Sequence, residues 1–150
     1  MKSHLVTTKN LLLLCLVLLI AWSVYPHLVM PTTTMLIGDE AFVLDVAKSA
    51  ATRERGLGGR EALEQNTGML FVFDSSSYHS FWMKGMRFPV DIAWLDDEWC
   101  VVHLVSNVSP ETYPETFAPS RPARYVIELA AGVLETQKVS VGGCFEAPQI

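Results

Sequence analysis

The sequence predicts a single, mainly β domain: a small β-barrel or jelly-roll-like sandwich with two short helices. Short segments rich in branched and aromatic residues recur at close spacing, and turn-forming residues separate them. Several of these segments, 99–105 above all, are apolar on both faces, which is typical of a closed or two-layered sheet. The expected strands span residues 42–46, 68–73, 78–84, 90–95, 99–105, 125–129 and 139–145.

Two helices and one long loop complete the predicted domain. Ser49 is a suitable N-cap for a helix over residues 50–55, and Gly56 ends it. A second short helix is expected over residues 132–137. The stretch 106–122 contains four prolines, and structureless loops of this length are often functional.

The first 23 residues predict export. Lys2 and Lys9 precede an apolar run over residues 11–22, and Ala21 and Ser23 are small residues at suitable cleavage positions. This pattern is that of a secretory signal peptide.

The alternative is an uncleaved membrane anchor, because apolar residues continue as far as Met30. Residues 24–34 are then a linker, and residues 35–150 form the β domain. Either interpretation places the domain outside the cytoplasm, in the periplasm or anchored to the membrane.

The charge balance limits the classes of partner. The chain has 11 basic and 16 acidic residues, a formal charge of −5. Without Lys2 and Lys9 it keeps 9 basic residues against the 16 acids, a charge of −7. An acidic domain argues against a nucleic-acid partner and against anionic lipid. We therefore expect membrane contact only through the N-terminal segment, if that segment is retained.

Two cysteines lie in the predicted domain. Cys100 and Cys144 are disulfide candidates if the domain is exported, because oxidising compartments preserve such bonds. Two separate buried thiols are the alternative.

Five short motifs occur in order between residues 55 and 129. They are Arg-Gly-Leu-Gly-Gly-Arg at 55–60, Gly-Met-Leu-Phe-Val-Phe at 68–73, Phe-Trp-Met-Lys at 81–84, Pro-Val-Asp-Ile-Ala at 89–93 and Pro-Ala-Arg-Tyr-Val-Ile-Glu-Leu at 122–129. Together they resemble the DUF192 family (uncharacterised ACR) over residues 42–145, and the leader suggests an exported member. The resemblance implies a small jelly-roll-like β-barrel, and it implies no activity and no catalytic residues.

The chain departs from the usual family pattern at two motifs. Gly58 stands where the family usually has methionine, and Gly85 and Met86 replace an Asn-Thr pair. If that polar pair contacts a ligand in relatives, this chain has lost those contacts.

Charged residues inside apolar strands mark a candidate binding site, because such charges must reach solvent or find partners. Strand alternation places Trp82 and Lys84 on one face, and likewise Arg124 and Glu128 on one face of another strand. We expect a cluster at one end of the barrel formed by Trp82, Lys84, Asp91, Arg124 and Glu128. An indole beside opposite charges suits a small polar or carbohydrate-like ligand. The same residues also fit a structural ion-pair network, which is the more conservative interpretation.

Metal and nucleophile motifs are weak. His79, His103 and Asp91 lack the short spacing of zinc sites, so we expect no metal and no cofactor. The serines at 75–77 lack the glycine context of a nucleophile elbow. Asp91 and Glu128 are the remaining acids for paired-carboxylate hydrolysis.

Three functions follow from these observations. The first is an extracytoplasmic accessory or binding domain for a small polar ligand or another envelope protein. The second is a small envelope hydrolase with Asp91 or Glu128 as general base. The third is a scaffold in which the charges serve folding alone.

Overall fold

A computed structural model of the chain describes residues 10–11, 13–17 and 30–150. The chain divides into two units, residues 1–30 and 31–150, and every described strand lies in the second. Most of the predicted leader, residues 1–23, falls outside the described residues. No helix in the described segments has the length and apolar character needed to span a bilayer.

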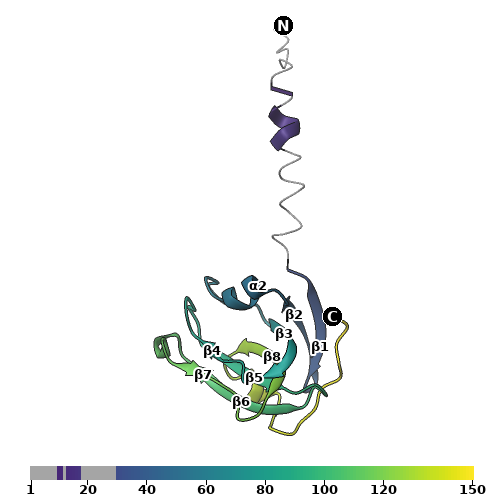
Figure 1. Ribbon diagram of the computed structural model, residues 1–150, viewed down its shortest axis with the longest axis vertical. Coiled ribbons are helices and arrows are strands. Elements are labelled where there is room, and N and C mark those ends of the chain that lie inside the picture. Colours follow the sequence, from purple (N-terminus) through teal and green to yellow (C-terminus); the bar gives the residue numbers. More distant parts are fainter. Residues whose placement is uncertain (1–9, 12, 18–29) are drawn as a thin grey trace. The chain divides into compact units, whose positions relative to one another are not determined.

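The domain is built on one mixed six-stranded sheet and a small two-stranded ribbon (Figure 1). The large sheet has the spatial order β1 (Thr32–Ile37), β2 (Glu40–Ala47), β3 (Thr67–Ser77), β8 (Ala123–Ala130), β5 (Val90–Leu95) and β6 (Val101–Val108). The ribbon pairs β4 (Phe81–Trp82) with β7 (Thr116–Phe117). Short helical segments are α2 (Ala50–Arg55), η1 (Pro110–Thr112) and α3 (Val133–Thr136).

The mainly β, sandwich-like fold is confirmed. Strands β1 and β6 are the two ends of the described sheet order, so the sheet does not close into a barrel. A third short helical segment, η1, lies inside the proline-rich stretch in addition to the two predicted helices. Strand β1 was not predicted, and it begins within residues 24–34 and pairs antiparallel with β2.

The predicted strand at 139–145 is absent. Only Cys144 forms an isolated bridge, opposite Cys100. Gly142 has a positive φ of 88°, which breaks the extended backbone there. The C-terminal segment instead runs beside β1, where the Thr33 hydroxyl donates to the Gln149 carbonyl oxygen at 2.7 Å (Figure 1).

One face of the sheet, here called the α3 face, carries the main apolar cluster. It includes Leu44, Leu70, Ala93 and Ile127 from four neighbouring strands. Leu134 of α3 belongs to the same cluster and is buried. The helix therefore covers this face of the sheet.

The opposite face, here called the α2 face, carries a chain of aromatic contacts. The Phe81 ring from β4 meets the Phe71 ring edge-on, with centroids 4.8 Å apart, and the Trp94 ring at 5.8 Å. Gly56, which ends α2, lies against the Phe71 ring. With both faces covered, all six residues of β5 are buried, which explains why five of them are apolar and Asp91 is the exception.

Close approach of β3 to β8 requires glycine at position 68. A Cβ atom there would lie 2.4 Å from the Glu128 carbonyl oxygen and 2.8 Å from a Leu129 methyl carbon. Because these contacts are impossibly short, we expect Gly68→Ala to lower the free energy of unfolding by about 2 kcal/mol or more, measured by urea denaturation. Ser77→Ala, at an exposed position of the same strand, is the control and should stay within about 0.5 kcal/mol of wild type. Equal stability of Gly68→Ala and wild type would contradict this strand packing.

Candidate functional site

A pocket of about 320 Å³ opens on the α2 face. Its lining comes from α2, from the loop that follows α2, and from β3, β4 and β8. The residues that carry chemistry there are Arg53, Phe73, Trp82, Lys84 and Glu128.

Glu128 is the buried polar group of this pocket. It lies in the middle of β8, between Met69 of β3 and Ile92 of β5, and its relative exposure is 5%. No described residue forms a hydrogen bond with its Oε2 atom. Burial raises the pKa of Glu128 from 4.5 to about 8, while the positive charge of Arg60 opposes the shift. The carboxyl group is therefore mostly protonated at neutral pH, and it can act as a hydrogen-bond donor.

Arg60 does not neutralise Glu128, because it is engaged elsewhere. Its guanidinium group donates to Asp45 Oδ2 at 2.6 Å. Asp45 pairs with Met69, and Met69 pairs with Glu128, so the two acids lie on one face two strands apart. Arg60 thus remains with Asp45, the more exposed of the two acids.

Trp82 and Lys84 lie together at the mouth of the pocket, as strand alternation predicts. The Lys84 Nζ atom is 5.6 Å from the centroid of the Trp82 ring, and the indole is 45% exposed. Strand β4 is shorter than expected, and Lys84 lies in a turn with Gly85. The Gly59 N–H donates to the Gly85 carbonyl oxygen at 2.9 Å, which ties this turn to the loop after α2.

Arg53 and His79 belong to the pocket and were not predicted. The Arg53 guanidinium lies 4.8 Å from the centroid of the Phe73 ring and donates to the Val72 carbonyl oxygen at 3.0 Å. The His79 ring stacks on the Phe73 ring, and the two ring centroids are 3.5 Å apart. No local sequence pattern marks Arg53 or His79 as a site residue, because α2 and the segment before β4 come together only in the tertiary fold.

Asp91 does not join the other predicted site residues. Glu128 pairs with Ile92 across the sheet, so Asp91, one residue earlier, points to the α3 face. There its carboxylate accepts from the Asn107 N–H at 2.8 Å and from the Leu134 N–H at 2.9 Å. The expected cluster of Asp91 with Lys84 and Glu128 is wrong, and Asp91 instead joins β5, β6 and α3.

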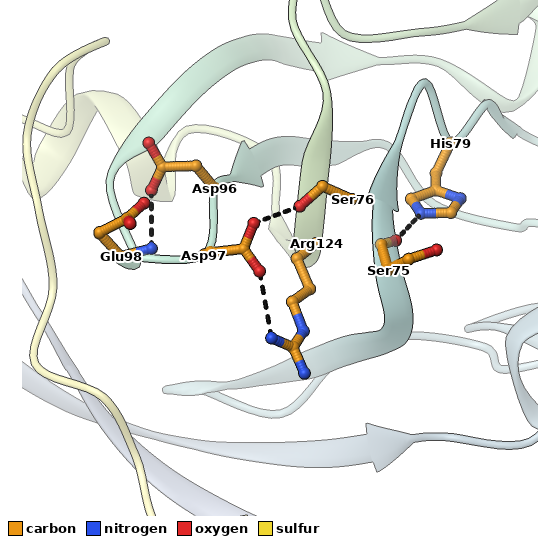
Figure 2. A network of polar contacts seen from close by, with 7 residues as sticks. All are labelled: Ser75, Ser76, His79, Asp96, Asp97, Glu98 and Arg124. Atoms are coloured by element: carbon orange, nitrogen blue, oxygen red, sulfur yellow. Dashed lines mark hydrogen bonds and ion pairs between the residues drawn. The ribbon is translucent and has the colours of Figure 1, made fainter.

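Arg124 shares a face with Glu128 but lies at the far end of β8, about 13 Å along the strand. Figure 2 shows it donating to Asp97, at 3.1 Å, while Ser76 donates to the second Asp97 oxygen. The hydrogen bond from Ser76, then that from Arg124, lowers the pKa of Asp97. Both partners of the Arg124 pair are 40% exposed or more, so solvent screening leaves the pair little effect on stability.

The remaining sequence candidates concern the cysteines and a metal. The structure joins Cys100 and Cys144 in a disulfide, beside a backbone hydrogen bond from the Val101 N–H to the Gly143 oxygen. His79 Nε2 lies 3.1 Å from the Ser75 carbonyl oxygen (Figure 2). Within the described part of the chain, no three histidine, cysteine or acidic side chains converge as metal ligands.

The buried Glu128 predicts a distinctive pH dependence of stability. The unfolded chain releases this proton near pH 4.5, whereas the folded chain holds it until about pH 8. Its effect on folding is therefore absent at low pH, and stability falls as the pH rises from about 4.5 to about 8. We expect wild type to lose ~2–4 kcal/mol across this window relative to Glu128→Gln, measured by urea denaturation at a series of pH values. Parallel curves of unfolding free energy against pH for the two proteins would contradict this prediction. Glu54→Gln, at an exposed residue of the pocket, is the control, and its stability should change with pH as that of wild type does.

Asp91 stabilises the fold through two hydrogen bonds from backbone N–H groups. We expect Asp91→Ala to lower the free energy of unfolding by about 3 kcal/mol at neutral pH, because two backbone N–H groups lose their acceptor. Chemical denaturation measures this. Asp97→Asn is the surface control and should cost no more than about 1 kcal/mol. A loss for Asp91→Ala no larger than that of the control would show that these bonds do not hold α3.

Comparison with known proteins agrees with the fold. None of the curated proteins compared with the chain is detectably similar to it. A crystal structure described as that of a candidate transcription regulator from Sinorhizobium meliloti 1021 is 24% identical, with a TM-score of 0.70 over 77% of this chain and 91% of that one. A protein of unknown function from Novosphingobium aromaticivorans DSM 12444 is 22% identical, with a TM-score of 0.68 over 77% of this chain and 84% of that one.

These two similarities support the fold alone. Residues 33–146 match DUF192, described as an uncharacterized ACR. That match covers most of the chain and includes all five motifs. The chain belongs to the DUF192 family.

Proposed function

We propose that this protein is an extracytoplasmic binding domain for a small polar ligand, held in the pocket between α2, β4 and β8. Glu128 is the innermost contact, and Lys84 and Trp82 form the mouth. One observation carries the proposal: the Glu128 Oε2 atom is buried in the wall of a pocket without a hydrogen-bond partner among the described residues.

A buried carboxyl oxygen without a hydrogen-bond partner lowers the stability of the fold, and a functional role explains why the residue is there. Leaving such a group unsatisfied costs about 1–3 kcal/mol, and an apolar residue of similar size would avoid that cost. A ligand that hydrogen-bonds Glu128 removes the penalty when it binds. Buried groups with shifted pKa values in clefts are typical of functional sites.

The scaffold hypothesis has less support than binding. It requires the predicted charges to form ion pairs with one another. In the described structure Lys84 lies over Trp82, Arg124 pairs with Asp97, and Asp91 is on the opposite face from Glu128. Of the predicted site acids, Asp91 is the one that accepts hydrogen bonds from two described backbone N–H groups, as a structural acid does.

Two features support a location outside the cytoplasm. The apolar run after Lys2 and Lys9 is typical of an export segment. The Cys100–Cys144 disulfide is a bond that reducing compartments rarely preserve.

A small hydrolase is the second candidate, favoured by the pKa of Glu128 of about 8, which suits a general acid near neutral pH. A second carboxylate is not available from Asp91, whose oxygens accept from backbone N–H groups on the other face. The exposed Glu54 is the other acid that lines the pocket. Turnover of ester or glycoside substrates that disappears in Glu128→Gln would favour this function over binding.

The ligand site can be tested with a fragment screen by NMR, using sugars, acids, amides and amines. We expect hits that perturb the pocket residues and bind at least ten-fold more weakly to Glu128→Gln and to Trp82→Ala. Arg124→Gln, at the far end of β8, is the matched control and should bind as wild type does. The proposal would be refuted by hits whose affinity is the same for Glu128→Gln as for wild type, or by hits that all bind outside this pocket.

A further inference from the structure

The charge of the pocket is opposite in sign to that of the whole domain. From residue 31 onward the chain has 9 basic and 16 acidic residues. Three of those basic residues line the pocket, namely Arg53, Arg55 and Lys84, against two acids. One of the two acids, Glu128, is mostly protonated at neutral pH. The pocket is therefore locally positive in an acidic protein, which favours an anionic ligand.

The inner end of the pocket offers a hydrogen-bond donor. Lys84 remains over the Trp82 ring and Arg60 remains on Asp45, so neither forms an ion pair with Glu128 in the described structure. A protonated carboxyl in an apolar site donates a strong hydrogen bond to a ligand oxygen. Glu128 lines the pocket, and its buried Oε2 atom has no hydrogen-bond partner among the described residues.

The remaining walls are apolar and largely aromatic. Phe71, Phe73 and Phe81 line the pocket, and Leu57 closes it from the loop after α2. Flat, rigid walls of this kind select a ligand body that is itself flat and apolar. A volume of about 320 Å³ suits a small molecule.

We propose that the ligand is a small organic carboxylate with a flat apolar body, whose oxygens accept a hydrogen bond from Glu128 and face the charges of Arg53 and Lys84. This assignment rests on the proposed function. Binding forms no covalent bond. The Glu128 proton stays on its carboxyl group and is shared with the ligand oxygen.

The surroundings of Glu128 argue against a cationic ligand. The charged or titratable groups that line the pocket with Glu128 are Arg53, Glu54 and Arg55 from α2, and His79 and Lys84 on either side of β4. The charge of Arg60, from the loop after α2, also acts on Glu128. The cross-strand neighbours of Glu128, Met69 and Ile92, carry no charge. An amine would have to enter a pocket lined by three basic side chains, so their repulsion opposes its attraction to Glu128.

Three probes of matched shape test the assignment on the full-length protein: benzoate, benzamide and benzylamine. We expect benzoate to bind at least ten-fold tighter than the other two at pH 6.5, measured by NMR titration of the pocket resonances. Its affinity should fall about ten-fold per pH unit above pH 8, because ionised Glu128 repels the anion and no longer donates. Lys84→Met should weaken benzoate binding and leave benzamide unchanged, since the charge alone is lost.

The outcomes separate this inference from the proposed function. Tighter binding of benzylamine or benzamide, lost in Glu128→Gln, overturns the carboxylate assignment and leaves the binding site standing. Benzoate affinity that does not change between pH 6.5 and pH 10 also overturns it. If none of the probes binds and the fragment screen finds no Glu128-dependent ligand, both the assignment and the proposed function fail.

Discussion

Double burial of the central strands β5 and β8 determines what every charged group on them can do. Both strands are largely buried, and Asp91 is fully buried while Glu128 is 5% exposed and lines the pocket. Asp91 is compensated by two backbone N–H donors, one of which belongs to the start of α3. Glu128 has no such donors and keeps its proton instead. Two acids on adjacent strands therefore serve different purposes, one holding secondary structure together and one facing a pocket.

The faces on which the side chains of one strand lie could be predicted from the sequence, whereas the alignment of residues between neighbouring strands could not. Alternation correctly placed Arg124 and Glu128 on one face of β8. Trp82 and Lys84 do lie together, although Lys84 is in a turn after β4 and not in the strand. The sequence offered no way to see that Glu128 lies opposite Ile92, and this offset of one residue sends Asp91 to the other face. β1 was missed because its threonines resembled a linker, although branched residues favour strands. Apolar residues suggested a strand at 139–145. The strand does not form, because the backbone leaves the extended conformation at the glycines of this segment.

The site itself depends on contacts between distant segments, which explains why only part of it was predictable. Arg53 reaches the pocket from α2, although residues 50–55 showed no chemical motif. The two departures from the family pattern also meet there, since Gly58 lies about 4.0 Å from the point where Gly85 would carry a Cβ atom. Gly58 lines the pocket and Gly85 follows Lys84 in the neighbouring turn, so the departures come together in the fold.

The central claim is that Glu128 is a protonated carboxyl inside a pocket, and its own titration tests that claim most directly. Carboxyl carbon NMR with selective glutamate labelling, and Glu128→Gln for assignment, reports the ionisation of this one group. The account predicts a pKa of about 8 for Glu128 in the protein without added ligand. A pKa close to the ordinary 4.5 would mean that water or a counter-ion reaches the carboxyl, and it would contradict the account.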